Sequence, residues 1–142
     1  MINSSEERSV FSKVDQIGIV VKDIEKYMRL YEKMFGVEPF PTVESTINSA
    51  KLKIVLFELD TVEIELIQVI EGESIHSRFL KEKGEGLHHL GFFVKDIEKE
   101  LATLEKDGIR VLERGEVLGT VKFAYLDTEK TLGIVLELIQ YD

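Results

Sequence analysis

The sequence predicts an α+β fold made of two tandem modules that share the order of their elements. The hexapeptide Val-Lys-Asp-Ile-Glu-Lys occurs at 21–26 and again, unchanged, at 94–99. A second string, Glu-Leu-Ile-Gln, occurs near the end of each half, at 65–68 and 137–140. Matching strings in the same order indicate an internal repeat in which each half is one structural unit. We therefore expect two βαβββ modules related by pseudo-two-fold symmetry.

Each module is expected to begin with a strand and to continue, after a helix, with further strands. Residues 14–21 and 87–94 are rich in β-branched, aliphatic and aromatic side chains, which is typical of strands. Similar apolar runs later in each half predict the remaining strands. These lie at 52–58, 62–69, 109–113, 121–127 and 133–140.

A helix is predicted directly after the first strand of each module. Asp23 and Asp96 are favourable N-cap residues, and apolar side chains recur at helical spacing over 24–34 and 97–107. A glycine follows each segment, where a left-handed residue commonly ends a helix. These glycines are Gly36 and Gly108.

Length and composition fit one globular domain. The chain has 142 residues, of which 44% are hydrophobic and 32% are charged. Residues 1–10 are largely polar and are expected to form a disordered tail. Residues 11–142 then form the domain, with module one at 11–72, a linking helix at 74–83 and module two at 84–142.

Charge and composition exclude several classes of protein. The 27 acidic and 18 basic residues give a net charge of -9, which repels nucleic-acid phosphates. No stretch approaches the roughly 20 apolar residues that span a membrane, and the N-terminus lacks the apolar core of a signal peptide. Cysteine is absent, which removes thiolate chemistry and fits the reducing cytoplasm where we expect the protein.

Four polar residues stand within apolar strands and are related in pairs by the repeat. Gln16 corresponds to His89, and Glu65 corresponds to Glu137. A single strand histidine is more often structural, and a single strand glutamate more often faces solvent. Four residues paired by the repeat can instead converge when the modules pack together. Two carboxylates, an imidazole and an amide oxygen would suit one divalent first-row ion, such as cobalt, manganese, nickel or zinc.

The doubled module with inward polar residues resembles the vicinal oxygen chelate superfamily of glyoxalases, epimerases, extradiol dioxygenases and bleomycin-resistance proteins. The resemblance covers about 12–141, and the second half looks most like the methylmalonyl-CoA epimerases. It rests on the segment from Glu73 through Leu87-His-His-Leu-Gly-Phe, and on Gly133-Ile-Val-Leu-Glu-Leu. It implies a cupped mixed sheet around a metal site, and a small-molecule carbonyl or thioester substrate.

The same resemblance implies the roles of individual residues. Its metal ligands fall on Gln16, Glu65, His89 and Glu137, and its function is a metal-dependent isomerase or epimerase that removes a proton alpha to a carbonyl. Glu137 is the expected base, and Lys53 is the nearest match to the position of the second base. Glu58 and Glu44 are the other candidates. The resemblance also implies a homodimer, which would cover the open edge of each half-barrel sheet.

Three alternatives remain open. The set Gln, Glu, His, Glu resembles some glyoxalase I lyases, although the arginine expected after the first ligand is Val20 here. A non-catalytic protein that sequesters a ligand, like the bleomycin-resistance proteins, is the second. A ring-cleaving dioxygenase is disfavoured because Gln16 replaces one of its two histidines. Two further histidines are expected to be structural: His76 solvated or capping a helix, and His88 hydrogen-bonded in the outer layer.

Overall fold

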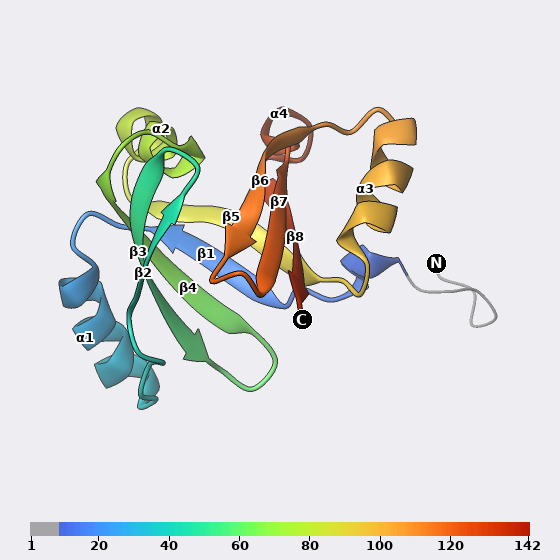
Figure 1. Cartoon of the computed structure of the whole chain (residues 1–142). Coiled ribbons are helices and arrows are strands. Elements are labelled where there is room, and N and C mark those ends of the chain that lie inside the picture. Colours follow the sequence, from blue (N-terminus) through green and yellow to red (C-terminus); the bar gives the residue numbers. More distant parts are fainter. Residues whose placement is uncertain (1–8) are drawn as a thin grey trace.

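The first half of the protein forms one side of a mixed sheet, seen on the left of Figure 1. The computed structural model describes residues 9–142. A 3-10 turn precedes the first strand, and a helix separates that strand from three others. The elements are η1 (Val10–Ser12), β1 (Gln16–Val20), α1 (Ile24–Phe35), β2 (Val43–Ile47), β3 (Ala50–Glu58) and β4 (Glu63–Glu71).

The second half repeats this order after a connecting helix. That helix has a capping box, in which the side chain of Ser74 accepts from the backbone N–H groups of His76 and Ser77. The elements are α2 (Ile75–Lys83), β5 (Gly86–Phe93), α3 (Ile97–Lys106), β6 (Val111–Val117), β7 (Val121–Leu126), α4 (Glu129–Leu132) and β8 (Val135–Tyr141).

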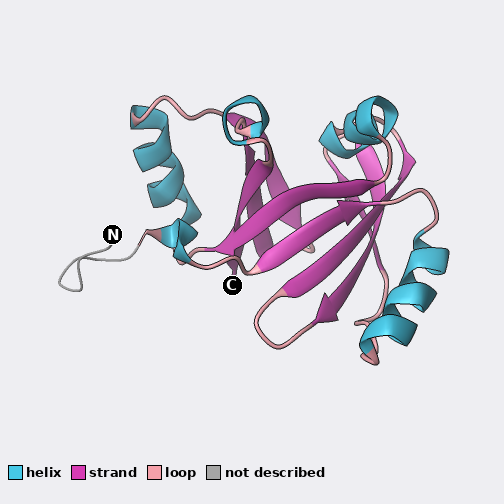
Figure 2. Cartoon of the chain, turned by 180° about the vertical axis from the view of Figure 1, so that it is seen from behind, coloured by secondary structure: helices cyan, strands magenta, loops and turns pink. Residues whose placement is uncertain are grey.

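All eight strands belong to one sheet whose order is β2-β3-β4-β1-β5-β8-β7-β6. The order is symmetric about the antiparallel pair β1 and β5, and each module contains one parallel pair, β1 with β4 and β5 with β8. The edge strands β2 and β6 contact each other, so the sheet curls into a nearly closed cup. Figures 1 and 2 show the two halves from opposite sides. The predicted α+β fold with two βαβββ modules in pseudo-two-fold arrangement is confirmed.

Strand alternation divides the apolar residues between the two faces of the sheet. On β3, Leu52, Ile54 and Leu56 face the concave side, whereas Val55 and Phe57 pack beneath α1 on the convex side. A matching cluster beneath α3 includes Ile97, Leu101, Phe92 and Leu138. The two helices therefore cover the outside of the cup and leave the concave side available for a site.

The helix signals in the sequence act as expected. The side chains of Asp23 and Asp96 accept hydrogen bonds from the backbone of Lys26 and Lys99. Gly36 and Gly108 have φ angles of 68° and 81°, the left-handed region that favours glycine. Two short elements had no separate signal, namely the edge strand β2 and the four-residue helix α4. Within residues 9–142, no helix is long and apolar enough to cross a membrane.

The expected first residue of the domain, Phe11, lies in η1, and the domain bounds stay a prediction. Phe11, in η1, packs edge-on against Phe92 with ring centroids 5.0 Å apart. Most of the tail expected at 1–10 lies outside the described residues. The expected homodimer stays a prediction, and the contact between β2 and β6 already covers part of each sheet edge within one chain.

Candidate functional site

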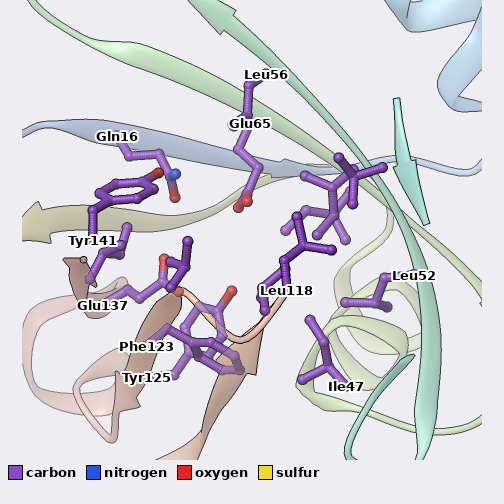
Figure 3. Close-up of a pocket in the computed structure, with 16 residues that line it drawn as sticks. Gln16, Ile47, Leu52, Leu56, Glu65, Leu118, Phe123, Tyr125, Glu137 and Tyr141 are labelled. Carbon is purple, nitrogen blue, oxygen red and sulfur yellow. The ribbon is translucent and has the colours of Figure 1, made fainter. Parts of the chain in front are cut away.

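The polar residues singled out in the strands meet on the concave side of the sheet. His89 is fully buried, and its Nε2 atom lies within 3.3 Å of three side-chain oxygens. These are Gln16 Oε1 at 3.1 Å, Glu65 Oε1 at 3.3 Å and Glu137 Oε1 at 3.1 Å. Figure 3 shows Gln16, Glu65 and Glu137 pointing into one cavity. Each residue comes from a central strand, β1, β4, β5 or β8, so pairing around the pseudo-two-fold axis brings them together.

Two glycines make this convergence possible. Gly18 is the register partner of His89, and a Cβ atom there would lie 1.9 Å from the imidazole Cε1. Gly91 is the register partner of Gln16, and a Cβ atom there would lie 3.0 Å from Gln16 Cβ. Each module therefore provides a side chain that lies over a glycine of the other module.

The orientation of the Gln16 amide is set by Glu63. Gln16 Nε2 donates to Glu63 Oε1 at 2.8 Å, and the Tyr141 hydroxyl donates to the same oxygen at 3.2 Å. Because the amide nitrogen is engaged there, the Gln16 oxygen faces His89 Nε2. Glu63 thus presents Gln16 to the site as an oxygen donor, which is the form in which an amide binds a metal ion.

His88 contacts the other ring nitrogen of His89. The two Nδ1 atoms are 2.9 Å apart, so one proton is shared between them. Burial, followed by the neighbouring histidines, lowers the pKa of His88 to about 2, and this side chain is therefore neutral. When His89 Nδ1 carries the proton and donates it to His88, Nε2 is left with a free lone pair toward the three oxygens. Metal-binding histidines generally donate their other ring N–H to a neighbour, and here the acceptor is a second histidine.

Without a cation the two carboxylates lack adequate partners. Glu65 Oε1 and Glu137 Oε1 are buried and make no directed hydrogen bond, although both lie within ion-pair distance of His89 Nε2. Burial lowers the pKa of His89, but Glu137 and Glu65 oppose this effect and raise it overall to about 9. A proton on His89 is the only positive charge this cluster itself provides. Buried carboxylate oxygens in this condition are usually paired or bound to metal, so the residues present fit a divalent ion.

The cluster lies on the wall of a cavity of about 220 Å³. Most of the lining is aliphatic or aromatic, from strands of both modules, and none of the described lining residues is Lys or Arg. Tyr125 and Tyr141 provide hydroxyl groups near the acidic end. An apolar cavity with a few convergent polar groups is the usual form of a small-molecule site.

The structure places the candidates for a second base away from this cluster. Lys53 lies on the convex face, where its Nζ is 3.8 Å from Glu25 of α1. Glu44 is its register partner on β2 and pairs with Lys51 at 3.5 Å. Glu58 is exposed at the end of β3 and does not line the cavity. Strand alternation explains the result for Lys53, because its neighbours Leu52 and Ile54 take the inward positions.

One other expectation requires correction. His76 is not solvated: it is 2% exposed, and its Nε2 lies 3.1 Å from the Tyr125 hydroxyl. His88 is hydrogen-bonded, as expected, but its partner is His89, and its ring is buried against that of Phe79 on α2. Sequence reasoning also missed Glu63 and Tyr125. The alternation of Glu63 with Glu65 on one face of β4 was the available signal for the first, and no local signal existed for the second.

Comparison with known proteins finds relatives that cover most of the chain. The sequence model of the glyoxalase/bleomycin resistance protein/dioxygenase superfamily matches residues 15–125. The uncharacterized protein YqjC of Bacillus subtilis is 28% identical over 131 residues, which cover 91% of this chain and 92% of the relative. The mitochondrial methylmalonyl-CoA epimerase of Dictyostelium discoideum is 26% identical over 132 residues, covering 89% of this chain and 76% of that protein.

Solved structures share the fold at lower identity. A hypothetical protein, BH1468 from Bacillus halodurans, superposes with a TM-score of 0.77 at 24% identity, covering 92% of this chain and 94% of that chain. Methylmalonyl-CoA epimerase from Mycobacterium tuberculosis superposes with a TM-score of 0.77 at 18% identity, covering 100% and 93%. A Streptomyces coelicolor methylmalonyl-CoA epimerase variant in complex with 2-nitronate-propionyl-CoA gives 0.74 at 22% identity, covering 91% and 94%.

Proposed function

Because the chain belongs to the glyoxalase/bleomycin resistance protein/dioxygenase superfamily, we propose that it is a metal-dependent isomerase that removes a proton alpha to a carbonyl group. The observation that carries the proposal is the pair of buried, unsatisfied carboxylate oxygens on Glu65 and Glu137, which face one imidazole inside an apolar cavity. A protein that only sequesters an apolar ligand has no need to bury two such oxygens, because their burial is costly.

The residues that would hold the ion are Gln16, Glu65, His89 and Glu137. Their potential ligand atoms come from four different strands, and those of Glu65, His89 and Glu137 lie within 4.8 Å of one another. A divalent ion at this place would stabilise negative charge on a substrate carbonyl oxygen, which makes the neighbouring C–H group more acidic. Glu63 and His88 support the cluster by fixing the orientations of Gln16 and His89.

Glu137 is the group we assign to move the proton. It is 4% exposed and lines the cavity, so a substrate there would lie beside it. Burial raises the pKa of its carboxyl, whereas the charge and hydrogen bond of His89 act in the opposite direction. A carboxylate whose pKa is raised is a more effective general base than an ordinary one. Glu137 would accept the proton from the alpha carbon and return it, and the apolar walls would exclude competing water.

Acyl thioesters are the substrate class that we place first. The relatives from Dictyostelium discoideum and Bos taurus are methylmalonyl-CoA epimerases, at 26% and 25% identity. One solved structure with the same fold is an epimerase in complex with 2-nitronate-propionyl-CoA. Epimerisation is therefore the leading form of the proposed reaction.

A glyoxalase I-type lyase is the second candidate, and one observation favours it. Epimerisation by two bases requires a group on each side of the substrate carbon, yet Lys53, Glu44 and Glu58 all lie outside the cavity lining. A one-base isomerisation needs only Glu137. Both reactions begin with the same proton removal, so the residue roles above hold for either.

The test is proton–deuterium exchange followed by NMR with the cobalt-loaded protein, using methylmalonyl-CoA, propionyl-CoA and the hemithioacetal of glutathione and methylglyoxal. Wild type should exchange the alpha proton of at least one of these, and Glu137→Gln should abolish the exchange. Glu44→Gln makes the same chemical change on the convex face and should retain it. Full exchange by Glu137→Gln with cobalt bound would overturn the proposal and favour a ligand-sequestering role.

A further inference from the structure

A line of buried polar groups connects the start of α2 to the cavity. Ser74, His76 and Tyr125 are 3%, 2% and 4% exposed. His76 Nδ1 lies 3.4 Å from Ser74 Oγ, and His76 Nε2 lies 3.1 Å from the Tyr125 hydroxyl. None of these groups belongs to the cluster of Gln16, Glu65, His89 and Glu137 to which the proposed reaction is assigned. The line is therefore a buried polar feature that the proposed reaction leaves unexplained.

The hydrogen bonds at Ser74 determine which group donates and which accepts along this line. Ser74 Oγ already accepts from the backbone N–H of His76 at 3.1 Å and from that of Ser77 at 3.3 Å. A hydroxyl oxygen has two lone pairs, so both are in use and its own proton is available for His76 Nδ1. Burial, together with the charge on His89, lowers the pKa of His76 to about 3, and its ring is neutral. A neutral ring that accepts at Nδ1 carries its proton on Nε2.

The same reasoning fixes the Tyr125 hydroxyl as a donor toward the cavity. His76 Nε2–H donates to the Tyr125 oxygen, so the phenolic proton must point elsewhere. Tyr125 and Glu137 are register partners on β7 and β8, and the Tyr125 hydroxyl points toward the acidic end of the cavity in Figure 3. A phenol has an ordinary pKa of about 10, so the hydroxyl keeps its proton at neutral pH.

We propose that Ser74, His76 and Tyr125 form a hydrogen-bond chain that makes Tyr125 a positioning residue for Glu137, donating to its carboxylate and fixing how that group faces the cavity. The inference rests on the proposed function only for its consequence in catalysis. The direction of the chain is a property of the metal-free protein. The chain also accounts for the buried histidine at the second position of α2, which is not among the four ligands proposed above.

The first experiment reads the chain directly in the metal-free protein. Two-bond ¹⁵N–¹H spectra should show His76 as the neutral Nε2–H tautomer from pH 5.5 to 7.5. In Tyr125→Phe the carboxyl ¹³C resonance of Glu137 should shift, because its donor is removed. The matched control is Tyr31→Phe. Tyr31 lies on α1, packs on the convex side of the sheet and does not line the cavity. An Nδ1–H tautomer, or an unchanged Glu137 resonance in Tyr125→Phe, would overturn the chain.

The second experiment measures how the hydrogen-bond chain affects metal binding. Tyr125→Phe and His76→Leu should weaken cobalt binding about 10-fold and change the visible absorption of the cobalt form, as loss of outer contacts generally does. His76→Gln retains a donor to Tyr125 and should recover part of the affinity. Circular dichroism establishes which variants are folded. Wild-type affinity and spectrum in folded Tyr125→Phe would refute the positioning role. Failure of wild type to bind cobalt would instead refute the proposed function, leaving the spectra of the metal-free protein to decide the chain.

Discussion

Gly18 and His89 face each other across β1 and β5, and the His89 imidazole occupies the space that a side chain at position 18 would need. The approach is 1.9 Å between a Cβ built on Gly18 and His89 Cε1, with the ring nitrogens at 2.2 and 2.4 Å. His89 is fully buried and cannot move aside into solvent. The absence of a side chain at residue 18 is therefore part of the candidate metal site.

Gly18→Ala should disrupt the site more than any other single methyl addition to these strands. We expect cobalt binding to fall below detection and the free energy of unfolding to drop by about 1–3 kcal/mol, as is typical of overpacking. Titration calorimetry and urea unfolding measure the two effects. Gly91→Ala is the milder comparison, because a Cβ built on Gly91 would lie 2.9 and 3.0 Å from its nearest neighbours. It should reduce cobalt affinity and the free energy of unfolding less than Gly18→Ala does. Cobalt affinity in Gly18→Ala equal to wild type would show that His89 is not a ligand.

Metal binding should release a proton at neutral pH. Glu137 and Glu65 outweigh burial and raise the pKa of His89 to about 9, so His89 is protonated in the metal-free protein at pH 7. A metal ion needs the unprotonated Nε2, so affinity should rise about tenfold per pH unit up to about pH 9. Calorimetry in buffers of different ionisation enthalpy counts the protons, and cobalt is a suitable ion. His89→Ala should bind weakly and release none. Absence of proton release from wild type at pH 7 would contradict this assignment.

The metal-free protein should lose stability as the pH falls below about 6.5. Burial lowers the pKa of His76 to about 3 and that of His88 to about 2, whereas the unfolded chain has histidine pKa values near 6.5. Between these limits the unfolded state binds protons that the folded state does not, so acid favours unfolding, by about 1.4 kcal/mol per pH unit for each histidine. Urea unfolding at pH 6.5 and 5.5 measures the slope. His88→Gln should reduce it, and an unchanged slope would show that His88 titrates normally in the folded protein.

Removing the side chains that lie outside the cavity should leave the proposed chemistry intact. Lys53→Ala and Glu58→Gln are expected to retain alpha-proton exchange within about twofold of wild type, because neither residue lines the cavity. The assay is the NMR exchange measurement described above, with Glu137→Gln as the inactive reference. Loss of exchange in folded Lys53→Ala would restore Lys53 as a candidate base, and would imply that β3 shifts its register when substrate binds.

The sequence was sufficient to predict the architecture because both halves show the same order of elements. Identical strings at 21–26 and 94–99 mark the same strand-to-helix junction in each module, with Asp23 and Asp96 as caps. These signals act over a few residues, so no knowledge of distant contacts is needed. The edge strand β2 was missed because it has five residues and its strand conformation depends on pairing with β3.

Sequence patterns identify the chemically unusual residues, whereas the tertiary fold brings some of them together and keeps others apart. Polar groups at Gln16, Glu65, His89 and Glu137 stand out because burying them in apolar strands is costly without partners. The place of Lys53 could not be settled that way, since its face depends on pairing across strands. The burial of His76 against Tyr125 depends on how α2 docks on the second module, a contact between residues far apart in the chain. Local patterns determine secondary structure and the free-energy cost of burying a polar group. Long-range packing determines which side chains lie close together.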